Sequence, residues 1–252
     1  MIRAKLFLVA AVAAAVAAAP ASAVTTFATF SGLGDNVRLE KSGPNEATLF
    51  TISTTTPNSS AQAIVPDSVG VTFSFVNTPL SALGSLNAFF TMDVAITDAA
   101  TSLGGGFYTQ NTGAGTFSFL STAPISWGGT TFAAGFNLPS GSFCTATLFG
   151  ASSSGSLSGS TDTCAFLTFT SDLLDFSDTT SRDFSLSLTA ITPILNALSG
   201  ETLGSFNAFS SGNFSAEPLP NGIPEPGTWA MLLLGIGMVG AVHRRRRSAV
   251  HA

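Results

Sequence analysis

Apolar residues alternate with small polar residues along most of the central chain, and this two-residue period restricts the fold more than any other feature. Residues 69–76, where Val71, Phe73 and Phe75 take alternate positions, and residues 184–191 are the clearest examples. Successive side chains of an extended strand point to opposite faces, so this period separates Phe and Val from Ser and Thr. The pattern therefore predicts strands that each bury one face.

Turn residues separate these segments at short intervals, which is typical of an all-β fold. The 22 phenylalanines and the 9% of charged residues favour a folded domain, because disordered chains are poor in aromatic residues and rich in charge. We expect a single β-sandwich-like domain of about ten strands. The expected strands are 25–30, 36–40, 47–53, 69–76, 86–97, 107–110, 116–120, 143–149, 164–170, 184–191 and 205–215.

The first 23 residues have the layout of a secretory signal peptide. Arg3 and Lys5 precede an apolar run at 6–19, and Ala21 and Ala23 provide the small residues that a signal peptidase reads. We expect Sec-type export, cleavage after Ala23, and a signal helix that is removed from the mature protein.

The opposite end has an apolar segment at 229–242 and a basic stub at 243–252. The segment is shorter than the roughly 20 residues that span a bilayer comfortably, and neighbouring residues extend it. Positive charge is retained on the cytoplasmic side of a membrane, so the stub predicts a transmembrane helix anchored in the inner membrane. The residues that stop transfer are Arg244, Arg245, Arg246 and Arg247.

A short motif precedes this helix and gives the tail a recognisable sequence signature. It consists of Pro224, Glu225, Pro226, Trp229 and Ala230. Together with the apolar segment and the arginines, it resembles the PEP-CTERM sorting signal in its Pro-Glu-Pro-x-x-Trp-Ala form, over residues 223–248. The remaining 24–222 would then be one exported all-β domain.

The resemblance implies a destination for the chain. Tails of this family are recognised by exosortase, a membrane-embedded cysteine protease or transpeptidase, and the passenger is released or attached at the cell surface. Such proteins often come from Gram-negative bacteria that make exopolysaccharide. The same tail also carries an ice-binding-protein C-terminal label, which describes the tail alone.

Charge and histidine content exclude several function classes. The net charge is −5, and six of the nine basic residues lie in the two ends, so the central domain is acidic and repels nucleic acid. His243 and His251 are the only histidines, which leaves 24–222 without Ser-His-Asp catalysis or a histidine-ligated metal. We therefore expect no enzymatic activity; a glycosidase that uses two carboxylates is the third alternative.

Two candidate sites remain in the central domain. Cys144 and Cys164 enter an oxidising compartment, so we expect a disulfide, with a reactive or metal-binding thiol pair as the alternative. Asp172, Asp175, Asp178 and Asp183 form the densest acidic cluster, and the hard oxygens of the first three suit calcium; a solvated turn is the alternative. No other cofactor is expected.

These observations lead to one functional prediction. The chain is expected to be a non-enzymatic exported protein of the cell surface or extracellular matrix, sorted by exosortase and associated with exopolysaccharide. The alternative is a ligand-binding β-sandwich with calcium or a glycan as ligand. Ice binding ranks below both, because it needs a regular array of threonines and the runs at 54–56 and 130–131 are short.

Overall fold

A computed structural model describes residues 24–32, 34–52, 68–164 and 166–217. These residues form sixteen strands and one short 3-10 helix, η1 (Leu80–Leu83), so the all-β prediction is confirmed and the prediction of about ten strands is wrong. The strands are β1 (Thr25–Gly32), β2 (Val37–Gly43), β3 (Glu46–Thr51), β4 (Val69–Phe75), β5 (Ser85–Ile96), β6 (Thr101–Gly104), β7 (Phe107–Asn111), β8 (Gly115–Ser121), β9 (Ile125–Trp127), β10 (Thr130–Phe132), β11 (Asn137–Phe143), β12 (Thr147–Ala151), β13 (Ser154–Ser160), β14 (Thr168–Thr170), β15 (Ser181–Thr192) and β16 (Phe206–Glu217).

Fourteen of these strands form one continuous sheet, and β9 and β10 form a separate hairpin. The long path through the sheet is β14-β11-β8-β5-β3-β2-β16-β15-β13-β12-β7-β6. Two short strands, β4 and β1, make a second connection between β5 and β16, because β4 pairs with β5 and β1, and β1 pairs with β16. The expected sandwich is therefore made by one sheet that folds over itself.

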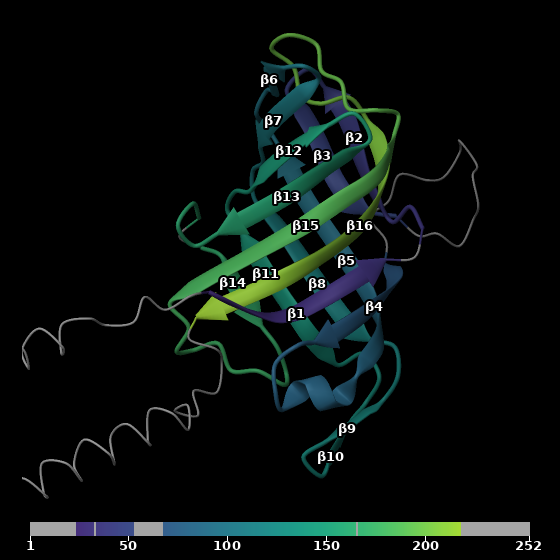
Figure 1. The fold of residues 1–252 in the computed structure, drawn as a ribbon, viewed down its shortest axis with the longest axis vertical. Coiled ribbons are helices and arrows are strands. Elements are labelled where there is room, and N and C mark those ends of the chain that lie inside the picture. The colour runs from purple at the N-terminus through teal and green to yellow at the C-terminus, as the bar shows by residue number, and fades with distance from the viewer. Residues whose placement is uncertain (1–23, 33, 53–67, 165, 218–252) are drawn as a thin grey trace, which may run out of the picture. The chain divides into compact units, whose positions relative to one another are not determined.

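The two halves of this sheet face each other across a core of phenylalanine. Phe117 of β8 lies 5.9 Å from Phe184 of β15 and 5.0 Å from Phe214 of β16, measured between ring centroids. Figure 1 shows β13, β15, β16 and β1 in one layer, with β11, β8 and β5 behind them. The alternating phenylalanines thus fill the space between the layers, as the two-residue period requires.

Side chains supply the missing ladder hydrogen bonds where short strands meet end to end. The Asn36 side-chain oxygen accepts a 2.7 Å hydrogen bond from the Ser210 amide of β16, between the pairing regions of β1 and β2. The Thr51 hydroxyl accepts a 3.0 Å bond from the Met92 amide of β5, between the pairing regions of β3 and β4. Both side chains are fully buried, so they replace ladder bonds that water cannot supply.

Close packing between neighbouring strands requires a glycine in β11. A Cβ atom on Gly141 would lie 2.3 Å from the carbonyl oxygen of Thr168 and 2.6 Å from the Phe117 ring. The first atom belongs to the backbone, so it cannot turn away as a flexible side chain would. Gly141 therefore allows β14 to pair with β11 directly above a core ring.

The predicted disulfide is confirmed and closes a β-hairpin. Cys144 and Cys164 are bonded, with their Cα atoms 5.6 Å apart. The Ser- and Gly-rich segment between them forms β12 and β13 and buries Leu148 and Leu157. Pairing with β7 and β15 on its two sides makes this segment part of the sheet.

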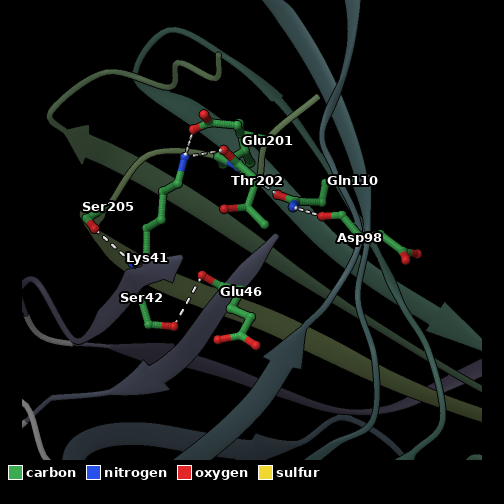
Figure 2. A network of polar contacts seen from close by, with 9 residues as sticks. Lys41, Ser42, Glu46, Asp98, Gln110, Glu201, Thr202 and Ser205 are labelled. Carbon is green, nitrogen blue, oxygen red and sulfur yellow. Dashed lines mark hydrogen bonds and ion pairs between the residues drawn. The ribbon is translucent and has the colours of Figure 1, made fainter. Parts of the chain in front are cut away.

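A polar network ties the long β15–β16 connection to strands β2 and β7 and to the β5–β6 turn (Figure 2). Lys41 forms an ion pair with Glu201, and the Ala100 amide donates to the Glu201 carbonyl at 2.8 Å. The buried Gln110 side chain donates to the Asp98 carbonyl at 2.6 Å and accepts from Leu203 at 3.2 Å. These bonds satisfy loop backbone groups, which indicates a structural role for the network.

Two predicted helices lie outside the described residues: the signal helix within 1–23 and the apolar helix 229–242. Among the residues that the structure describes, no helix is long and apolar enough to cross a membrane.

Candidate functional site

Rows of hydroxyl groups cross the outer face of the β12–β13–β15–β16–β1–β4 layer. Strand register places side chains directly opposite one another, about 4.8 Å apart from strand to strand. One row runs through Asn111, Thr147, Ser158, Ser185, Asn213, Thr29, Ser74 and Ser85. The next runs through Thr109, Phe149, Ser156, Ser187, Ser211, Ser31, Thr72 and Asn87.

These rows point away from the core. The residues that alternate with them, among them Leu157, Leu186 and Phe214, are buried, whereas Ser158 and Asn213 are exposed. Apart from the exposed Phe149 in the second row, the face presents hydroxyl and amide groups that both donate and accept hydrogen bonds.

The opposite layer has a similar row on its outer face. Thr168, Ser142, Thr116 and Asp93 lie side by side on β14, β11, β8 and β5. The hydroxyls of Ser142 and Thr168 are 2.9 Å apart, close enough to share a hydrogen bond. Exposed apolar side chains interrupt this face at Phe89 and Leu120. The first face also carries exposed apolar side chains, since the rings of Phe149 and Phe107 lie 6.0 Å apart there, so both faces mix polar and apolar groups.

Backbone amides hold two carboxylates of the acidic cluster that was predicted as a calcium site. Asp172 accepts from the Asn137 amide at 2.9 Å, and Asp175 accepts from the Ser177 amide at 2.9 Å. The Ser177 hydrogen bond holds the pKa of Asp175 below its usual value. Asp178 is exposed.

Within the described residues, no three acidic, cysteine or histidine side chains come close enough to hold a metal ion. Calcium binding stays a prediction. It would raise the melting temperature of the protein in millimolar calcium by mass action.

The remaining predicted site residues lie outside the described part of the chain. They are the signal-cleavage residues Ala21 and Ala23, the motif residues Pro224, Glu225, Pro226, Trp229 and Ala230, and the arginines Arg244, Arg245, Arg246 and Arg247.

Comparison with known families assigns the tail. Residues 222–247 match the PEP-CTERM protein-sorting motif, the stretch in which the sequence placed the Pro-Glu-Pro-x-x-Trp-Ala element. The chain is a PEP-CTERM domain-containing protein. The match covers the tail and leaves the β domain unassigned, and no match was found to a curated protein or to a solved structure.

The PEP-CTERM motif makes this chain an exported protein that exosortase targets and sorts to the cell surface. The β domain is thus the part that would be delivered. The hydroxyl rows of this PEP-CTERM protein were not predicted from the sequence. Alternating Ser and Thr on single strands was visible, but a row exists only once the register between distant strands is known.

Proposed function

We propose that this chain is a non-enzymatic protein of the cell surface or extracellular matrix that associates with exopolysaccharide. The observation that carries the proposal is the hydroxyl-lined outer face of a domain whose tail directs it to the surface. Sugar polymers present hydroxyls that donate and accept hydrogen bonds, and the rows offer the same chemistry in a repeating array.

The composition of the domain supports a binding role over a catalytic one. The only histidines, His243 and His251, lie in the tail, so the domain has no imidazole for general acid–base catalysis. Lys41 and Arg38 are paired with Glu201 and Glu40. Neither of these two cations is left unpaired to recognise an anionic ligand, which favours a neutral polar one.

Delivery to the surface follows a defined sequence in this proposal. A Sec-type route exports the chain, and signal peptidase removes residues 1–23. The helix 229–242 then holds the chain in the inner membrane. Exosortase then acts at the PEP-CTERM motif, which releases the domain or attaches it at the surface.

Co-sedimentation with exopolysaccharide from the producing cells tests the binding part. The full-length chain, expressed in those cells and purified from the fraction that holds it, should bind the isolated polymer and leave its length unchanged. A protein that stays in the supernatant at every polymer concentration would refute the association. Shortening of the polymer by the pure protein would refute the non-enzymatic role.

Fractionation of cells tests the sorting part. Glu225→Ala and Trp229→Ala should accumulate as unprocessed chain in the membrane fraction, because both residues belong to the motif that exosortase reads. Thr228→Ala, at a variable position of the same motif, is the matched control and should be processed normally. Normal processing of both motif variants would contradict this route.

A further inference from the structure

A hollow of about 310 Å³ opens on the outer face of β12, β13, β15 and β16. This volume lies at the lower end of the range of small-ligand sites, about 300–1,000 Å³. The side chains around it are short: Ser158, Ser160, Ser185 and Ser215 stand where larger residues would fill the surface. The hollow is thus built into the regular face by residue size.

Asp183 lies centrally among these short side chains. In the sheet register, Asp183 of β15 is flanked by Ser160 of β13 and Ser215 of β16. Ser185 and Asn213, from the adjoining row, also line the hollow. One carboxylate and one amide are therefore surrounded by hydroxyl groups from three neighbouring strands.

Several of these polar groups have unused hydrogen-bonding capacity. Within the described part of the chain, the side chains of Ser158, Ser185, Asn213 and Asp183 make no hydrogen bond to another protein group. Ser215 differs, since its hydroxyl lies 3.1 Å from that of Thr26. The unpaired groups converge on one hollow, where a bound molecule could satisfy them together.

The charge of the hollow restricts the chemistry of its ligand. Burial and the nearby carboxylate of Asp162 raise the pKa of Asp183 above its usual value. Among the described residues that line the hollow, none is basic. Arg182, which precedes Asp183 in the chain, donates instead to the Phe176 carbonyl at 2.9 Å. An anionic ligand would therefore meet repulsion without a compensating cation.

We propose that this hollow binds a neutral, polyhydroxylated sugar unit of a polysaccharide, with Asp183 as its principal acceptor. The carboxylate accepts hydrogen bonds from two sugar hydroxyls, and the Asn213 amide and the serine hydroxyls both donate and accept. Hydrogen bonds to a charged acceptor are stronger than neutral ones, so Asp183 contributes most to affinity. The assignment rests on the proposed association with exopolysaccharide and gives that association a location.

Two variants test the site in different ways. Asp183→Asn keeps the size of the side chain and removes the charged acceptor. Ser158→Trp fills the hollow from an exposed position on β13 and leaves Asp183 intact. Asp93→Asn is the matched control, because it makes the same change at an exposed acid on the outer face of β5.

The probes are the neutral and acidic fractions of the exopolysaccharide from the producing cells, separated by anion exchange. Full-length protein is titrated with each fraction, and thermal unfolding confirms that every variant is folded. Asp183→Asn and Ser158→Trp should each weaken binding to the neutral fraction by about tenfold or more, and Asp93→Asn should change it by less than about twofold.

Each other outcome has a distinct meaning. If the wild-type chain binds the neutral fraction and both hollow variants bind it equally well, the site is wrong and the association stands. Loss of binding in Asp93→Asn alone would move the site to the opposite layer and overturn this assignment. Preference for the acidic fraction would overturn the ligand chemistry. A wild-type chain that binds neither fraction would overturn the proposed function itself.

Discussion

The Thr51→Val substitution tests whether a single hydroxyl stabilises the sheet by accepting a hydrogen bond between β3 and β4. Valine has nearly the shape of threonine, so the substitution changes the hydrogen bonding at this position far more than the packing. Thr51 is fully buried, and its hydroxyl accepts the hydrogen bond that the structure shows for the Met92 amide of β5. In the variant that amide faces a methyl group and has no access to water.

The size of the effect follows from the burial of that amide. A buried donor left without an acceptor costs about 1–3 kcal/mol, and water cannot enter a position with zero exposure to replace the acceptor. For a domain of this size, 1 kcal/mol shifts the melting temperature by about 2–4 °C. A loss near the middle of the range, about 2 kcal/mol, thus predicts a fall of about 4–8 °C.

Urea unfolding followed by circular dichroism measures the change, with thermal unfolding as the second readout. Thr91→Val is the matched control, since Thr91 precedes Met92 on β5 and is exposed on its outer face. The control should stay within about 0.5 kcal/mol of wild type. If Thr51→Val is as stable as Thr91→Val, the hydroxyl does not support the sheet and the reasoning is wrong.

Three further predictions concern packing, the disulfide and pH. Gly141→Ala should lower the free energy of unfolding by about 1–3 kcal/mol, because its Cβ would meet a backbone carbonyl, whereas Gly70→Ala has open space; equal urea midpoints would contradict this. Replacing Cys144 and Cys164 by alanine should lower it by about 3 kcal/mol, as should adding reductant to wild type. The raised pKa of Asp183 means that the native state binds this proton more readily than the unfolded state, so stability falls as pH rises through the folded pKa. Asp183→Asn should therefore be the more stable protein near about pH 7, and a less stable variant would contradict the burial of that charge.

The strands with strong alternation were predictable from sequence. The segments around β4, β5, β15 and β16 were expected within a few residues of their observed bounds, because a two-residue period directly encodes one buried face. The disulfide was predictable from export and from the presence of only two cysteines.

Short strands with weak patterns were not predictable in the same way. β13 is built mainly of Ser and Gly, and β6 is wholly exposed, so neither has a hydrophobic period of its own. The expected strand 143–149 is in fact divided between the end of β11 and β12, with Cys144 in the break. These elements become strands because neighbouring strands offer them hydrogen-bond partners, and pairing between distant segments is absent from any local window of sequence.

The sorting tail and the alternating core strands could be predicted from the sequence, because a sorting motif and a two-residue period are each defined by residues near one another in the chain. The face that could bind a ligand was decided only by the tertiary structure. Ser158, Asp183 and Asn213 come from three strands, and register alone places them around one hollow. Register depends on how the two layers bury their phenylalanines together, which is a property of the whole sheet.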